Sequence, residues 1–149
     1  MKRITDLLIS IRRTTKLYEQ MLKVVCEKYQ LTQIEADIIS FLQNNPGKDT
    51  AKDIAELRML SKGNVSQAVE QLIQRSLLQR QQDTADRRKI PLSLLPEAKP
   101  IMEEIANTRN EFLECVFLGF SEAEREQYAA FNDRLMLNIG AAMKRGGKA

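Results

Sequence analysis

Five hydrogen-bonding side chains lie close together near the middle of the chain: Ser61, Lys62, Asn64, Ser66 and Gln67. The amide of Asn or Gln can pair bidentately with adenine, Lys can meet guanine or phosphate, and Ser can meet either bases or phosphate. These residue types therefore predict contacts with base edges rather than the making or breaking of covalent bonds. The alternative is that they form only the solvated face of a helix, with Ser61 as its N-cap.

A second polar cluster follows at Asp86, Arg87, Arg88 and Lys89. Arginine is attracted into the narrow minor groove of A·T tracts, and Asp86 could orient one arginine through a charge-assisted hydrogen bond. Residues 61–89 contain six cationic and three acidic side chains, an excess equal to the net charge of +3 of the whole chain. A charge cluster alone is often just a solvated surface, so it becomes informative only on a suitable fold.

Other kinds of chemistry find little support in the composition. The chain has no histidine, which removes the commonest general base and zinc ligand. No glycine-rich phosphate-binding motif occurs. The two cysteines, Cys26 and Cys115, fit no metal motif, and we expect both to be reduced and buried. The alternative for either is an exposed thiolate that senses oxidation. We therefore expect no enzyme, no metal and no cofactor.

Hydrophobic periodicity and capping signals predict the elements that position both clusters. Apolar residues at helical spacing predict a helix over 4–29. Thr32 and Glu35 form a capping box, so a second helix should begin there and end before Pro46. Shorter helices should begin at Thr50 and Ser61. The apolar residues of the helix after Ser61 should share its inward face, namely Val65, Val69, Leu72 and Ile73.

The second half of the chain reads as a hairpin followed by two helices. Leu77-Leu78 and Ile90–Leu94 predict two short strands around a polar loop. A helix should run from about Pro96 to about residue 118. Its first residue is ambiguous, because Pro96 and Pro100 cannot both occupy the first helical position. Ser121 and Glu124 form another capping box, which predicts a last helix reaching residue 143.

The predicted fold is mainly α with a small β-hairpin wing, a winged helix-turn-helix. We expect residues 32–95 to close their own core as the DNA-binding region, within one compact domain. The helices in 1–31 and 96–149 carry apolar stripes, and we expect them to form a dimerisation region about a two-fold axis. The alternative is a bundle within one chain. No apolar run is long enough to span a membrane and no signal peptide is visible, so we expect a cytoplasmic protein.

These features together resemble the MarR family of bacterial transcriptional regulators. The segments that carry the resemblance are Ile54-Ala55, Leu60–Ser66, Leu72, Leu77–Arg80, Asp86–Arg88 and Leu92–Leu94. The likeness extends over nearly the whole chain, because the flanking helices lie where this family has its dimerisation helices. It implies a homodimeric repressor on a pseudo-palindromic operator, with Asp86 and Arg88 as the wing pair. Many members release DNA when a small phenolic or lipophilic ligand binds, and others respond to thiol oxidation.

The chain departs from the family pattern at several positions. Met59 stands at a turn position where glycine is usual, and a positive φ there would cost on the order of 1 kcal/mol. Arg58 replaces a common apolar residue, Gln67 a frequent arginine, and Ser76 a helix-ending glycine. Leu95 and Ala98 replace a threonine and a glycine. These departures leave a second interpretation open: a dimeric winged-helix module that docks a partner protein and has weak or lost DNA binding.

Overall fold

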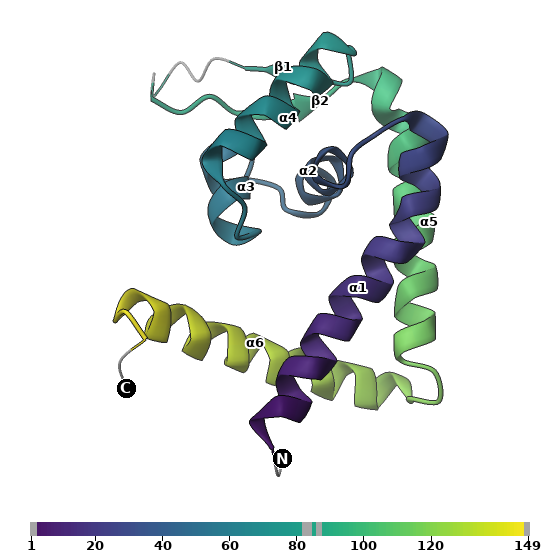
Figure 1. Cartoon of the computed structure of the whole chain (residues 1–149), viewed down its shortest axis with the longest axis vertical. Coiled ribbons are helices and arrows are strands. Elements are labelled where there is room, and N and C mark those ends of the chain that lie inside the picture. Colours follow the sequence, from purple (N-terminus) through teal and green to yellow (C-terminus); the bar gives the residue numbers. More distant parts are fainter. Residues whose placement is uncertain (1–2, 82–84, 86–87, 148–149) are drawn as a thin grey trace. The chain divides into compact units, whose positions relative to one another are not determined.

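The computed structural model of the chain describes residues 3–81, 85 and 88–147. In chain order its elements are α1 (Ile4–Tyr29), α2 (Gln33–Asn44), α3 (Ala51–Leu57), α4 (Lys62–Gln74), β1 (Leu78–Arg80), β2 (Leu92–Leu94), the 3₁₀ turn η1 (Pro96–Ala98), α5 (Lys99–Val116) and α6 (Glu122–Lys144) (Figure 1). The chain divides into two compact units, Met1–Phe112 and Leu113–Ala149. The mainly helical architecture with one antiparallel hairpin confirms the predicted fold class.

Reciprocal capping boxes set the starts of three helices. At α2 the Thr32 hydroxyl accepts from the Glu35 amide, and the Glu35 carboxylate accepts from the Thr32 amide at 2.8 Å. Ser121 and Glu124 do the same at α6, so both predicted boxes are confirmed. Thr50 forms a third box with Asp53 at α3. Each box satisfies backbone N–H groups that the first helical turn would leave without partners.

Left-handed residues other than glycine end three of the described helices, one of them being Met59 after α3. Gln30 has φ 53° after α1, and Ser76 has φ 60° after α4. The next amides then fold back onto the helices, from Leu31 to the Cys26 carbonyl at 2.8 Å and from Leu77 to the Leu72 carbonyl at 3.0 Å. This is the geometry that glycine usually provides. Ser76 therefore adopts the left-handed conformation for which glycine is usual at this position.

The two strands differ from their predicted bounds: β1 begins one residue later than predicted, at Leu78, and β2 is shorter than predicted. β1 and β2 pair antiparallel, with Leu78 opposite Leu94 and Arg80 opposite Leu92. The prediction that the second strand begins at Ile90 is wrong, because β2 starts at Leu92. Pro91 has no N–H to donate and only accepts, from the Gln81 amide at 2.7 Å. The Leu92 amide donates instead to the Asp49 carbonyl at 2.7 Å, which joins the hairpin to the segment before α3.

The two prolines after the hairpin occupy different elements. Pro96 opens the 3₁₀ turn η1, where its missing N–H is not needed. Pro100 is the second residue of α5, still within the first turn, where backbone N–H groups have no helical partner. The ambiguous helix start is thereby resolved at Lys99.

The hydrophobic core of the first unit extends beyond residues 32–95. Leu22 of α1 and Ile105 of α5 are both 0% exposed and belong to the same cluster as the centre of α2 and α4. The largest fully buried side chains are Leu22, Ile38, Ile39, Ile54, Val65, Val69, Leu72, Leu78 and Ile105. The winged helix-turn-helix therefore packs on both flanking helices rather than closing its core alone.

The outer helices leave large apolar side chains exposed in the single chain. On α1 these include Ile4, Leu8 and Ile11. Within α6 no described residue is buried, and its exposed apolar side chains include Tyr128, Phe131, Leu135, Ile139 and Met143. No helix in the described ranges is both long enough and apolar enough to cross a membrane.

Candidate nucleic-acid interface

The helix α4 divides its residues sharply between a buried and an exposed face. Val65, Val69 and Leu72 are buried, as the periodicity predicted, and Ile73 is partly buried. Ala68, which was not predicted, is buried too. Ser61 caps the helix: its side chain accepts from the Asn64 amide at 3.1 Å. The predicted contact residues Lys62, Asn64, Ser66 and Gln67 are all exposed. The structure thus brings these four side chains onto the solvent-facing part of the first two turns.

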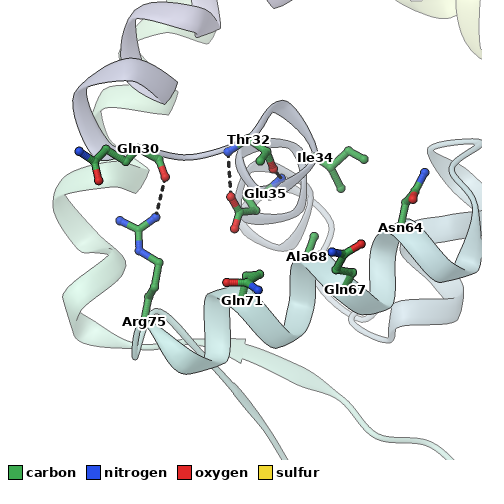
Figure 2. Close-up of a pocket in the computed structure, with 9 residues that line it drawn as sticks. All are labelled: Gln30, Thr32, Ile34, Glu35, Asn64, Gln67, Ala68, Gln71 and Arg75. Atoms are coloured by element: carbon green, nitrogen blue, oxygen red, sulfur yellow. Dashed lines mark hydrogen bonds between the residues drawn. The ribbon is translucent and has the colours of Figure 1, made fainter.

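Two cavities flank this exposed face on opposite sides of α4. The larger, of about 440 Å³, lies between α4 and the start of α2 and is lined by Gln30, Thr32, Ile34, Glu35, Asn64, Gln67, Ala68, Gln71 and Arg75 (Figure 2). Most of these side chains are polar. The smaller, of about 230 Å³, lies toward the hairpin and includes Lys52, Ser66, Arg80 and Arg88. Asn64 and Gln67 therefore face one flank and Ser66 the other.

The hairpin places cationic side chains beside α4. Arg80 of β1 forms an ion pair with Glu70 of α4. Arg88 lines the smaller cavity together with Ser66. Lys89 is exposed. Asp86 and Arg87, the remaining predicted wing residues, lie outside the described residues.

A strained turn joins α3 to α4. Met59 has φ 56°, so this residue does take the left-handed conformation considered from the sequence. Its side chain is 72% exposed, and that of neighbouring Leu57 is 57% exposed. Behind the turn, the Leu60 amide donates to the Ala55 carbonyl at 2.9 Å. The ion pair between Arg58 at the end of α3 and Asp37 of α2 braces the same turn. No sequence signal pointed to this pair.

The end of α4 also contacts the end of α1. The guanidinium of Arg75 donates to the Tyr29 carbonyl at 2.7 Å and to the Gln30 carbonyl at 3.0 Å. Figure 2 shows the second of these bonds at one end of the larger cavity. In the sequence, Arg75 is only one of six cationic side chains in residues 61–89. Its partners are backbone carbonyls 45 and 46 residues away, which residue types do not reveal.

The two cysteines differ in environment. Cys26 is buried, as predicted, and burial, reinforced by the nearby Asp37 and Glu35 carboxylates, raises the pKa of its thiol. A raised pKa disfavours the reactive thiolate. The expectation that Cys115 is also buried is wrong for the single chain, where it is exposed near the end of α5. It belongs to a stretch of α5 where Leu113 and Val116 are exposed too.

Sequence comparison finds similarity to a known family over part of the chain. The family model described as MarR family matches residues 29–89, which run from the end of α1 through the wing loop. A curated relative, the uncharacterized HTH-type transcriptional regulator YsmB of Bacillus subtilis (strain 168), is 24% identical over 136 residues, covering 91% of this chain and 90% of that protein.

Solved structures show the same fold over most of the chain. The transcriptional regulator SlyA has a TM-score of 0.77 at 19% identity, covering 93% of this chain and 97% of that one. The Staphylococcus aureus MepR–DNA complex has a TM-score of 0.66 at 20% identity, covering 93% and 96%. Bordetella bronchiseptica BpsR, whose DNA binding is regulated by 6-hydroxynicotinic acid, has a TM-score of 0.66 at 21% identity, covering 88% and 98%.

Proposed function

We propose that this chain is a DNA-binding transcriptional regulator of the MarR family whose α4 enters the major groove, since a model of that family matches residues 29–89. The supporting observation is the exposed polar face of Lys62, Asn64, Ser66 and Gln67 at the N-terminal end of α4. Recognition helices contact base edges with their N-terminal residues, and amide side chains suit adenine.

The wing supplies the second contact in this proposal. Arg88 and Lys89 follow the loop between the strands, and Asp86 and Arg87 precede them in the sequence. Arginine at this place would enter the minor groove beside the major-groove contact of α4. The cationic side chains at the smaller cavity, Lys52 and Arg88, extend the positive surface toward the phosphate backbone.

The chain acts in this proposal as a homodimeric repressor on a pseudo-palindromic operator. The apolar side chains left exposed on α1 and α6 support an interface with a second copy, because burying them would remove a large apolar area from water. Two copies related by a two-fold axis would present two α4 helices to two half-sites, and palindromic operators mirror that symmetry.

A salt series of binding measurements tests the DNA contact. Fluorescence anisotropy with DNA from upstream of the chain's own gene should give a dissociation constant of about 10⁻⁸ to 10⁻¹¹ M at physiological salt. Arg88→Ala should weaken binding and reduce the salt slope by roughly 1. Lys99→Ala, an exposed cation at the start of α5, is the matched control and should bind as the wild type does. Weak binding by the wild type that ignores sequence would overturn the proposal.

The exposed turn before α4 favours one other candidate, a module that docks a partner protein. Leu57 and Met59 form an exposed apolar pair there, which DNA phosphates would not attract. Reversing the charge of the wing with Arg87→Glu and Arg88→Glu separates the two functions. The double variant should lose DNA binding in the first case and keep its partner in the second.

A small aromatic or lipophilic effector is the remaining part of the proposal. The cavity of about 440 Å³ beside Asn64 and Gln67 is large enough for such a molecule, although its lining calls for polar groups on the ligand. Titrating small aromatic carboxylates into the protein–operator complex tests this. A fall in anisotropy that depends on the ligand supports an effector, and an unchanged complex at saturating ligand argues against this class.

A further inference from the structure

The contact between Arg75 and the end of α1 joins two parts with different roles. Arg75 is the residue after α4, and both carbonyls that it binds belong to the last residues of α1 and its cap. The two donor–acceptor distances are 2.7 and 3.0 Å, so one planar guanidinium holds two adjacent peptide groups. Such a two-point contact fixes direction as well as distance.

The chemistry of a helix end explains why an arginine suits this place. The last carbonyls of α1 have no partner within the helix, and the helix dipole makes that end negative. The Cys26 carbonyl is satisfied by the Leu31 amide, whereas the Tyr29 and Gln30 carbonyls accept from Arg75. A cation at the end of α4 is therefore held by the C-terminal end of α1.

The same end of α1 is fixed on another side by α5. Lys28 forms an ion pair with Glu104, and this contact lowers the pKa of the Glu104 carboxyl. Further along the two helices, the Tyr18 and Phe112 rings pack edge to face with centroids 5.2 Å apart. Contacts with α5 thus hold α1 in place, and the hydrogen bonds of Arg75 hold the end of α4 to α1.

We propose that Arg75 is a positioning residue that sets the direction of α4 relative to α1, and thereby the half-site spacing that a dimer accepts. The inference rests on the proposed function, since it concerns how a dimeric regulator meets its operator. In a dimer built on α1, the separation of the two α4 helices depends on how rigidly each is held to α1. Half-site spacing then follows from geometry rather than from base contacts.

Operators with altered spacing provide the test. Wild type, Arg75→Gln and Arg75→Lys are titrated with the natural operator and with one that carries an extra base pair at its centre. The wild type should discriminate strongly between the two. In Arg75→Gln the ratio of the dissociation constants for the two operators should fall at least about fivefold, which is the lower end of typical coupling between sites. Arg75→Lys keeps the charge but not the two-point contact, so it should discriminate poorly with an unchanged salt slope. Gln74→Ala, an exposed neighbour, is the control and should match the wild type.

Two results would overturn the inference while leaving the proposed function intact. The first is full discrimination by Arg75→Gln. The second is binding by Arg75→Gln that is weakened equally on both operators with a shallower salt slope, as removal of a plain phosphate contact would give.

A measurement without DNA separates failure of the inference from failure of the proposed function. Spin labels are placed at Gln67→Cys in both copies, in a Cys115→Ser background where the remaining thiol, Cys26, is buried. Arg75→Gln should broaden the distance distribution between the two labels. An unchanged distribution overturns the role of Arg75, whereas absent operator binding by the wild type overturns the regulator.

Discussion

Arg58 lies 3.3 Å from Asp37, measured between Nη2 and Oδ2, and this ion pair links the end of α3 to α2 behind the turn that leads into α4. The Asp37 side chain is only 16% exposed, while that of Arg58 is 44% exposed. Burial raises the pKa of the Asp37 carboxyl above its ordinary value of 3.8, and Arg58 opposes that rise without cancelling it. The folded chain therefore binds a proton at Asp37 more readily than the unfolded chain does.

Replacing Asp37 with Asn should remove a pH-dependent loss of stability. Because the folded-state pKa is raised, the contribution of Asp37 is fully present below its unfolded value near 3.8 and is lost as pH rises through the folded pKa. Urea unfolding at pH steps upward from 3.8 should show the free energy of unfolding of the wild type falling relative to Asp37→Asn. Arg58→Gln should move that loss to higher pH, because Arg58 lowers the pKa of Asp37. Parallel curves for wild type and Asp37→Asn would contradict the prediction.

Met59→Gly should stabilise the folded chain. A left-handed residue with a Cβ atom costs about 1 kcal/mol, and glycine removes that cost. Glycine also raises the conformational entropy of the unfolded chain, which offsets part of the gain. The net expectation is a gain of somewhat less than about 1 kcal/mol in denaturant unfolding. Met59→Ala keeps the Cβ atom and serves as the control, which should show no such gain. A loss of stability in the glycine variant would mean that the Met59 side chain has a contact not seen in the single chain.

Gly63→Ala should separate stability from DNA binding. A Cβ atom at Gly63 would meet nothing within 4 Å, so packing within the chain does not require glycine there. Alanine is the better helix former by about 1 kcal/mol at most, and the thermal midpoint should rise. If α4 approaches DNA closely at this turn, operator affinity should fall in the same variant. Unchanged affinity together with higher stability would place Gly63 away from the DNA.

Glu70→Gln and Arg80→Gln should change operator affinity in opposite directions. Their ion pair is exposed and contributes little to stability, about 1 kcal/mol or less. Removing Glu70 frees Arg80 for a phosphate and deletes a negative charge near the DNA, so binding should strengthen. Removing Arg80 should weaken binding and reduce the salt slope by roughly 1. If both variants weaken binding equally, the pair instead orients the hairpin against α4.

Phe131→Glu should dissociate the proposed dimer. The ring is 58% exposed in the single chain, and a carboxylate in an apolar interface would be costly. Sedimentation equilibrium should show a monomer at concentrations where the wild type is a dimer. Ala130→Glu adds the same charge at an exposed position of α6 outside the apolar stripe of that helix and controls for charge alone. A dimeric Phe131→Glu variant would place the interface elsewhere.

The sequence predicted most of the fold because its signals are local. The capping pairs Thr32–Glu35 and Ser121–Glu124 each span four residues, and both mark helix starts in the structure. The exposed face of α4 followed from periodicity in the same way. The second strand was predicted too long because the alternation of Ile90, Leu92 and Leu94 does not show where pairing with the first strand ends, which is at Leu92.

Contacts between distant residues escaped the sequence. The Arg75 contact with α1 and the pair of Arg58 with Asp37 join side chains to partners that only the folded backbone brings near. The exposure of Cys115 was missed for a related reason, since helical periodicity identifies an apolar stripe but not whether the same chain covers it. The DNA contacts at Ser61, Lys62, Asn64, Ser66, Gln67, Asp86, Arg87, Arg88 and Lys89 stay predictions.

The core that joins Leu22 to Ile105 has a consequence for the synthesis of the chain. A domain that leaves the ribosome from its N-terminal end can complete its packing only when all contributing segments have emerged. Here the segments after the hairpin include Ile101 and Ile105, which are 3% and 0% exposed in the finished fold. The nascent winged helix-turn-helix therefore has to wait for α5, and until then its apolar interior is open to chaperones and to aggregation.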